Sequence, residues 1–301
     1  MSLIESALAK LRRGGEPDAK PALVTPRPLA AANGAAVAIV PAPAPAPAPE
    51  QVPTKRFKID PKALRAAGYL PEEGLERRFA DHYRQIKRPL IEKALAAGGD
   101  MRFLMVTSAL PGDGKSFTSI NLAFSIARER DISVLLIDAD TPRARISEVL
   151  GLRGEPGLLD SLADHSLDVE SLIGRTDVRG LDFLPAGRLV EGATELLASD
   201  RMRQITARLC AHNPRRLVVF DSAPLLVSSE ARVLTRIPGQ IVLVARTGLT
   251  PRRAVADALK EVDKSKVQGI ILNHTPRRKG GDYYYGYSGY GTEEQPPSDS
   301  G

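Results

Sequence analysis

Residues 101–123 constrain the fold most, because they join a short apolar run to a stretch of helical spacing through a glycine-containing loop. Residues 103–107 have the composition of a buried strand, and helical spacing begins at Ser116. The loop between them reads PGDGKS at 111–116. Glycines let successive backbone N–H groups turn inward, and the following helix directs its positive end to the same place. This order of strand, loop and helix predicts a phosphate-binding loop.

Side-chain chemistry assigns roles within this loop. Lys115 is expected to neutralise the outer phosphates, and Ser116 is expected to be a Mg²⁺ ligand. The usual pattern opens with glycine where this chain has Ala109, but alanine adopts most of the same conformations when φ is negative. A chance turn that caps a helix is the alternative. The residues expected to bind the nucleotide are Pro111, Gly112, Asp113, Gly114, Lys115, Ser116 and Phe117.

Apolar strands alternate with helices along the rest of the chain. Strands are expected at 133–137, 181–184, 216–220, 241–245 and 269–272, and helices at 71–88, 116–128, 158–172, 193–212 and 251–262. Pro89 should stop or kink the first of these helices. The alternation predicts an α/β fold with a mostly parallel sheet and helices on both faces. Ligands of such sheets bind at the carboxyl ends of the strands.

Three aspartates directly follow apolar strands and should lie at that edge of the sheet. Asp221 has the Walker B form and is expected to hold Mg²⁺ through water. Of Asp138 and Asp140, one should assist the metal and the other is a candidate base, and the sequence does not apportion the two roles. The expected catalytic residues are therefore Lys115, Asp138 and Asp140, and the expected metal ligands are Ser116, Asp138 and Asp221.

The N-terminal part of the chain differs in composition from the middle. Residues 1–13 begin with a capping box and have helical amphipathic spacing, whereas 14–56 are rich in alanine and proline and predict a tether with no fixed fold. The net charge is +6 without a dense basic block, so no nucleic-acid partner is expected. No run reaches the roughly 18 apolar residues of a membrane span.

The C-terminal residues 276–301 concentrate tyrosine in a glycine-rich segment. Such a segment cannot pack a core, so these tyrosines do not serve burial. A sticky low-complexity tail and a stacking surface for single-stranded nucleic acid are alternatives that composition alone leaves open. The five tyrosines are Tyr283, Tyr284, Tyr285, Tyr287 and Tyr290.

Three segments of the middle of the chain then point to a known family. They read SALPGDGKS at 108–116, LLIDAD at 135–140 and VVFDSAP at 218–224. They resemble the Walker A, Walker A′ and Walker B motifs of the bacterial tyrosine kinases, and the resemblance extends from about residue 57 to the C-terminus. The opening MSLIE and YRQIKRPL at 83–90 are similar to the soluble autokinases associated with exosortase and exopolysaccharide loci. The resemblance implies a P-loop kinase domain at 57–275 that uses ATP and Mg²⁺.

The resemblance also implies regulation and partners. The tail tyrosines would be autophosphorylated in a neighbouring subunit's site, and the kinase would regulate exopolysaccharide synthesis or export. Asp81, Arg84 and Lys87 match the family's ring-forming helix. Asn273 would lie near the base of the bound nucleotide. A membrane protein of the polysaccharide co-polymerase type would be the activator, and a tyrosine phosphatase would act on the kinase. The expected location is the cytoplasm, at the inner membrane through that partner.

Two other classes share parts of this pattern. Partitioning or positioning ATPases of the ParA and MinD type have the same fold and a similar loop, but they carry a lysine near its start where this chain has Leu110. A nucleotide-dependent scaffold that binds ATP and scarcely transfers phosphate is the third alternative. The polysaccharide and the number of subunits are not encoded in any motif.

Overall fold

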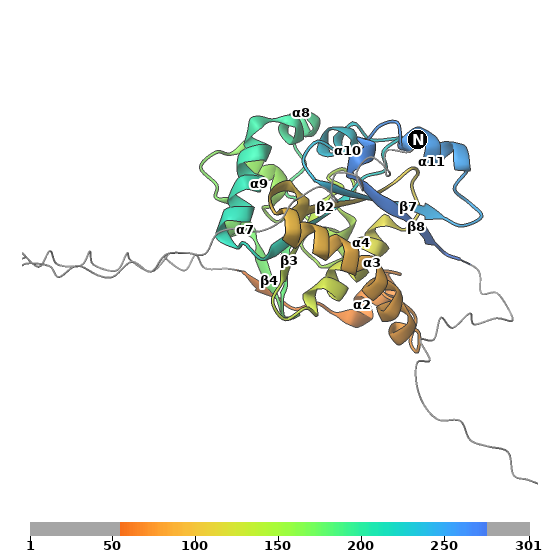
Figure 1. Ribbon diagram of the computed structural model, residues 1–301. Coiled ribbons are helices and arrows are strands. Elements are labelled where there is room, and N and C mark those ends of the chain that lie inside the picture. Colours follow the sequence, from red (N-terminus) through yellow and green to blue (C-terminus); the bar gives the residue numbers. More distant parts are fainter. Residues whose placement is uncertain (1–54, 276–301) are drawn as a thin grey trace, which may run out of the picture. The chain divides into compact units, whose positions relative to one another are not determined.

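The computed structural model describes residues 55–275, and the described strands form one eight-stranded sheet (Figure 1). The strand order is β1-β4-β5-β3-β6-β2-β7-β8, and only β4 and β5 pair antiparallel within it. The predicted mostly parallel α/β fold is therefore confirmed. The bounds are β1 (Arg56–Phe57), β2 (Phe103–Ser108), β3 (Ser133–Ala139), β4 (Gly174–Thr176), β5 (Leu181–Leu184), β6 (Arg216–Ser222), β7 (Gln240–Arg246) and β8 (Val267–Asn273).

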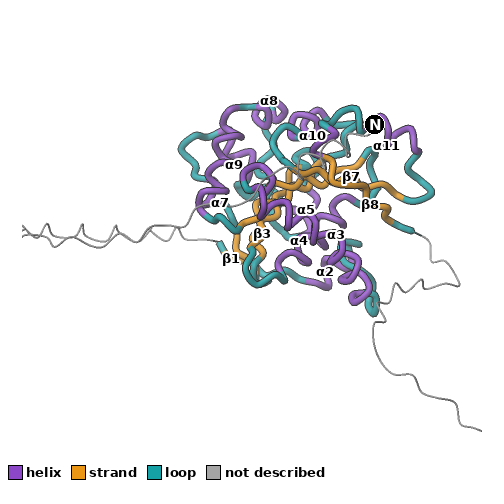
Figure 2. Tube along the Cα trace, viewed as in Figure 1, coloured by secondary structure: helices purple, strands orange, loops and turns teal. Residues whose placement is uncertain are grey.

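Helices cover both faces of this sheet (Figure 2). Helices α2, α3 and α4 pack against one face, and the core on the other face includes residues from α6 to α11. The helix bounds are α2 (Pro61–Ala66), α3 (Glu76–Ala97), α4 (Lys115–Ala127), α5 (Arg145–Val149), α6 (Leu158–Ala163), α7 (Val169–Leu172), α8 (Ala193–Ala198), α9 (Asp200–His212), α10 (Ser229–Leu234) and α11 (Arg252–Ala258), with 3₁₀ turns at Gly99–Arg102 and Lys264–Lys266.

The central strands are apolar on both faces because each face has its own core. In β2, Met105 lies in the core under α6 to α11, while its neighbours Leu104 and Val106 lie in the core under α3 and α4. Side chains alternate along a strand, so a continuous apolar run is what a strand buried on both faces requires. This arrangement leaves the strand ends as the places where polar residues can gather.

Helix α3 runs through Pro89, where the sequence predicted a stop or a kink that ends it near residue 88. Proline removes one hydrogen-bond donor from the helix. The next turn is held by packing, because Leu90, Ile91 and Ala94 are buried. Gln240 adds a tie from β7, since its Nε2 donates to the Leu90 carbonyl at 3.0 Å.

Other boundaries also differ from the prediction. The stretches 158–172 and 193–212 each divide into two helices, and the second break falls at Ser199, whose side chain caps α9 by accepting from the Met202 N–H. Helix α11 ends at Ala258 rather than at 262. Strands β1 and β4 have two and three residues, which is too short for a periodic signal.

Several predictions fall on residues outside the described range. The amphipathic helix at 1–13, the tether from 14 to 54 and the five tail tyrosines, Tyr283, Tyr284, Tyr285, Tyr287 and Tyr290, all lie there. The domain boundaries stay predictions for the same reason. Among the described helices, none has the length and apolar character needed to cross a bilayer.

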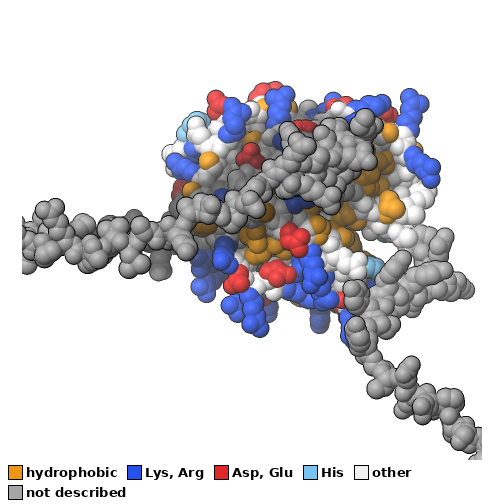
Figure 3. Space-filling model, viewed as in Figure 1, with side chains coloured by type: hydrophobic (Ala, Val, Ile, Leu, Met, Phe, Trp, Pro, Cys, Tyr) orange, Lys and Arg blue, Asp and Glu red, His pale blue; other side chains and the backbone are white. Residues whose placement is uncertain are grey.

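Lys87 was expected on a subunit contact, and the structure places it inside the fold. Its side chain is 6% exposed, and its Nζ donates to the Ser125 carbonyl at 2.6 Å and lies 2.7 Å from Glu129 Oε1. Asp81 and Arg84 are exposed and pair with each other at 2.9 Å. Figure 3 shows basic and acidic side chains interspersed over the face that carries α2 and α3. Lys87 therefore joins α3 to α4, and Asp81 and Arg84 remain on the surface.

Replacing Lys87 with methionine should lower the free energy of unfolding by about 2 kcal/mol, because a buried hydrogen bond and an ion pair are lost while the aliphatic stem is kept. Arg84→Met, at an exposed position of the same helix, should change it by less than about 0.5 kcal/mol. Urea unfolding of the full chain measures both values. Equal effects of the two substitutions would contradict the internal role of Lys87.

Candidate functional site

The loop between β2 and α4 lies at the carboxyl end of a central strand. Strand β2 pairs with β6 on one side and β7 on the other, and α4 begins at Lys115 directly after the loop. Gly112 and Gly114 have φ values of 86° and 95°, a left-handed conformation that side chains rarely tolerate. The two glycines thus shape a tight turn that leads into the positive end of α4.

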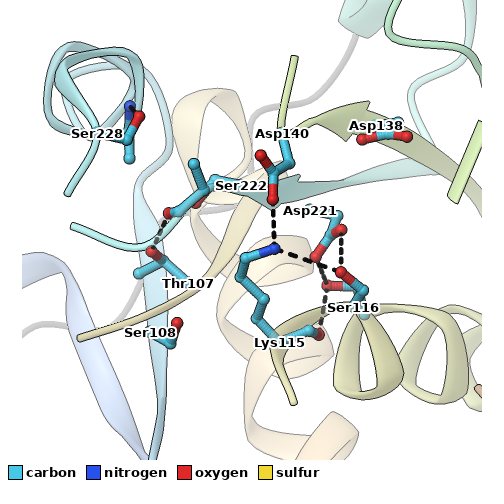
Figure 4. A network of polar contacts seen from close by, with 12 residues as sticks. Thr107, Ser108, Lys115, Ser116, Asp138, Asp140, Asp221, Ser222 and Ser228 are labelled. Carbon is cyan, nitrogen blue, oxygen red and sulfur yellow. Dashed lines mark hydrogen bonds and ion pairs between the residues drawn. The ribbon is translucent and has the colours of Figure 1, made fainter. Parts of the chain in front are cut away.

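Lys115 extends into a cluster of carboxylates (Figure 4). Its Nζ lies 2.5 Å from Asp140 Oδ2, and both side chains are nearly buried, at 10% and 1% exposed. Asp221 is held from α4, because Ser116 Oγ donates to its Oδ2 at 2.7 Å and Ser119 Oγ lies 2.8 Å from its Oδ1. The structure therefore brings the loop lysine, the loop serine and the strand-end aspartates of β3 and β6 together.

Asp138 is fixed through one oxygen and unengaged through the other. Its Oδ2 accepts from the Ser147 backbone N–H and hydroxyl, each at 2.8 Å, and the Ser147 hydroxyl also accepts from the Ala186 N–H at 3.1 Å. Its buried Oδ1 has no hydrogen-bond partner among the described residues. One carboxylate oxygen is thus committed to structure, and the second is available to a ligand.

The pKa values in this cluster are shifted because several carboxylates are buried around one ammonium group. Burial, together with the negative charge of the neighbouring Asp221, raises the pKa of Asp138 to about 7. Burial also raises the pKa of Asp221, although Lys115 and the hydroxyls of Ser116 and Ser119 oppose it. Burial would lower the pKa of Lys115, but the charges of Asp221 and Asp140 outweigh that effect and raise it. The site holds more negative than positive charge, so it favours an additional cation.

The donor set fits Mg²⁺. Asp138 Oδ1, Asp221 and Ser116 Oγ supply oxygen, the ligand type that this ion prefers. Within residues 55–275 no group of three or more acidic, histidine or cysteine side chains is arranged to hold a metal by itself. Mg²⁺ usually keeps several waters and takes further ligands from substrate phosphates. A site with few protein ligands beside a phosphate-binding loop agrees with that habit.

The loop is also held from the β7 and β8 side. Asp113, which is 2% exposed, accepts from Thr250 Oγ1 at 2.6 Å through its Oδ1 and from the Leu110 N–H at 3.3 Å through its Oδ2. Asn273, which is expected near the nucleotide base, donates from Nδ2 to the Asp113 carbonyl at 3.1 Å. A Cβ on Gly114 would lie 1.9 Å from that Nδ2. Asn273 therefore contacts the phosphate-binding loop itself.

Some residues of the site lie away from their expected place or were not expected. The ring of Phe117 packs edge-on against Phe79 of α3, with 5.7 Å between centroids, and its contact with a nucleotide stays a prediction. Ser147, Ser119 and Thr250 carry no motif that marks them in the sequence. The contacts of Ser119 and Thr250 join segments more than a hundred positions apart, whereas Ser147 lies nine positions after Asp138.

Comparisons with known proteins agree on one family, although no protein-family model matches the chain. The tyrosine-protein kinase YwqD of Bacillus subtilis strain 168 is 33% identical over 217 residues, which are 71% of this chain and 87% of YwqD. The tyrosine-protein kinase Wzc of Salmonella typhimurium is 33% identical over 62% of this chain. Etk of Escherichia coli K12 is 35% identical over 60% of it. The matches span 26% of Wzc and 25% of Etk, about a quarter of each.

Solved kinase domains have the same fold. The kinase domain of Escherichia coli ETK superposes with a TM-score of 0.60 at 29% identity, over 76% of this chain and 99% of that domain. The BceF tyrosine kinase domain superposes with a TM-score of 0.58 at 28% identity, over 70% of this chain and 85% of the BceF chain. The likeness thus covers most of each solved domain.

Lys115→Met should destabilise the nucleotide-free protein by about 3 kcal/mol, because it leaves buried carboxylates without their cation. Adding Asp140→Asn should recover most of that loss, since the amide removes the charge that Lys115 neutralises. Lys260→Met, at a 71% exposed position, is the matched control and should have little effect. Denaturant unfolding of the three variants measures these free energies. A double variant no more stable than Lys115→Met would contradict the pairing of Lys115 with Asp140.

Proposed function

This chain belongs to the bacterial tyrosine kinases, and we propose that it transfers the terminal phosphoryl group of ATP to the tail tyrosines of a neighbouring copy. The observation that carries the proposal is the meeting of the phosphate-binding loop, Lys115 and three aspartates at one edge of the sheet. The acceptors would be Tyr283, Tyr284, Tyr285, Tyr287 and Tyr290.

Each residue has a role in this proposal. The loop N–H groups and Lys115 bind the phosphates, and Ser116, Asp138 and Asp221 would hold the metal, Asp221 through water. Mg²⁺ held there would neutralise the charge that develops on the phosphate oxygens. In the nucleotide-free protein Lys115 pairs with Asp140. The triphosphate competes for that ammonium, and its binding frees the Asp140 carboxylate.

The released carboxylate then acts as the base. Asp140 accepts the proton of the incoming tyrosine hydroxyl while the phenolic oxygen forms a bond to the γ-phosphorus. The bond between that phosphorus and the bridging oxygen breaks, and ADP leaves. Asp138 does not compete for this role, because Ser147 holds one of its oxygens and the metal would take the other. In this proposal Asp140 is the base and Asp138 a metal ligand, the two roles that the sequence leaves unassigned.

Regulation would follow from charge. Each phosphate adds about −1.5 to −2 charges at neutral pH, so a phosphorylated tail is repelled by an acidic site and by its neighbours in a ring. We place the ring contact on α3, where Asp81 and Arg84 are exposed. The resemblance to kinases of exopolysaccharide loci supports control of exopolysaccharide synthesis or export. The proposal also includes a membrane activator of the co-polymerase type and a tyrosine phosphatase that opposes the kinase. It places the kinase in the cytoplasm, at the inner membrane.

The partitioning ATPase is the weaker alternative. Leu110 stands where those proteins carry the lysine that reaches the partner's nucleotide. YwqD, which this chain matches over most of its length, is named a tyrosine-protein kinase. Kinase chemistry therefore has the better support.

Mixing two variants tests transfer between subunits. One chain carries Lys115→Met and an intact tail, and the other keeps Lys115 but has all five tail tyrosines changed to phenylalanine. With ATP and Mg²⁺, phosphotyrosine should appear on the Lys115→Met chain in the mixture and not when that chain is alone. Mass spectrometry of differently tagged chains measures it.

Three other results would contradict this mechanism. Phosphotyrosine on the wild-type chain, with none on the Lys115→Met chain of the mixture, indicates transfer within one chain. Free phosphate without phosphotyrosine indicates an ATPase. Neither product in wild type, with nucleotide still bound, indicates a scaffold.

Arg84→Ala and Asp81→Ala should each lower the mass of the assembly in the presence of ADP, because both side chains are exposed on α3 and available to a second copy. Arg253→Ala on α11, at a 92% exposed position, is the control and should leave the mass unchanged. Analytical ultracentrifugation measures these masses. Assemblies of wild-type mass in both α3 variants would contradict a subunit contact at Asp81 and Arg84.

A further inference from the structure

Asp113 is unusual for its position, because its buried carboxylate lies within a loop expected to bind anions. Asp113 is 2% exposed, and it lies three residues after Leu110 and two before Lys115. A negative charge beside bound phosphate opposes binding strongly where water is excluded. Both of its oxygens are engaged, one by the Leu110 N–H and one by the Thr250 hydroxyl. These contacts indicate that the carboxylate serves to hold the loop.

Thr250 is built to keep that contact in one orientation. Its Oγ1 accepts from the Arg246 backbone N–H at 2.8 Å and donates to Asp113 Oδ1 at 2.6 Å. The Thr250 N–H donates to the Arg246 carbonyl at 2.9 Å. The hydroxyl therefore cannot turn away without losing a bond, and the end of β7 is tied to the phosphate-binding loop.

Asn273 ties the same loop to β8. Its Nδ2 donates to the Asp113 carbonyl and fills the space above Gly114, and its Oδ1 accepts from the His274 N–H at 2.9 Å. The Thr247 N–H donates to the Asn273 carbonyl at 2.9 Å. His274 adopts a φ of 54°, in the left-handed region that non-glycine residues adopt uncommonly. The sequence continues within two residues into the tyrosine-rich tail.

We propose that Thr250 and Asn273 are positioning residues that hold the phosphate-binding loop through Asp113 and couple nucleotide binding to the root of the tail. A nucleotide that orders the loop also orders the end of β8, and a pull on the tail loosens the nucleotide, because coupling between two sites is reciprocal. A subunit would thus present its tail differently with and without nucleotide. The consequence for the tail rests on the proposed function, whereas the positioning of the loop does not.

Nucleotide affinity tests the Thr250 contact. Thr250→Val keeps the shape of the side chain and leaves Asp113 Oδ1 without its donor, so the dissociation constant for fluorescent ADP with Mg²⁺ should rise about tenfold. The KM for ATP should rise in parallel with little change in kcat. Thr250→Ser restores the hydroxyl and should restore affinity. Thr247→Val in the same turn, whose hydroxyl does not touch Asp113, is the matched control.

The outcomes of this first experiment are distinct. Wild-type affinity in Thr250→Val overturns the proposal. Failure of Thr250→Ser to recover affinity also overturns it, since the hydroxyl would then not be the cause. Thermal melting of each nucleotide-free variant separates lost affinity from lost folding, and an affinity loss that merely follows a lowered melting temperature counts against the proposal.

Hydrogen exchange tests the coupling to the tail root. In the full chain, ADP with Mg²⁺ should slow exchange in peptides that cover 111–120 and 267–275. In Asn273→Ala, protection of 111–120 should persist while the effect on 267–275 is lost. Equal protection of 267–275 in both proteins overturns the coupling. Neither ADP binding nor hydrogen exchange needs phosphoryl transfer, so failure of the mixing experiment leaves these two results interpretable.

Discussion

The site depends on one electrostatic imbalance, in which a single ammonium serves three buried carboxylates. Lys115 pairs with Asp140, while Asp221 relies on serine hydroxyls and Asp138 on Ser147. A protein interior tolerates such a group only when each charge is hydrogen-bonded or paired. In the nucleotide-free cluster Asp140 therefore holds the ammonium that the proposed substrate would bind. Binding of a metal and a triphosphate would redistribute charges that the fold already holds together.

The architecture explains why these groups meet. Strands β3, β6 and β2 are neighbours in the sheet and run in the same direction, so their carboxyl ends lie together. Asp138 and Asp221 are register partners on β3 and β6. The loop that follows β2 then delivers Lys115 and Ser116 from a third strand. Residues separated by more than a hundred positions become adjacent because parallel strands align their ends.

Sequence reasoning recovers the parts of the site that have local signals. Neighbouring residues alone indicate these parts. Apolar runs before Asp138 and Asp221 predict strand ends, and glycines before Lys115 predict a phosphate-binding loop. Thr250 carries no such signal, because its contact with Asp113 spans 137 positions and depends on the path of a turn. Lys87 is expected on a subunit contact because its position matches the family's ring-forming helix, and that match does not reveal the Ser125 carbonyl of α4 to which Lys87 donates.

The order of strands in the sheet has a mechanical consequence. Strand β1, where the described residues begin, forms one edge, and β8, where they end, forms the opposite edge, with six strands between them. At about 4.8 Å per strand, the two edges are roughly 34 Å apart. A force applied to the chain at β1 would therefore act on one edge of the sheet, and a force applied at β8 would act on the opposite edge.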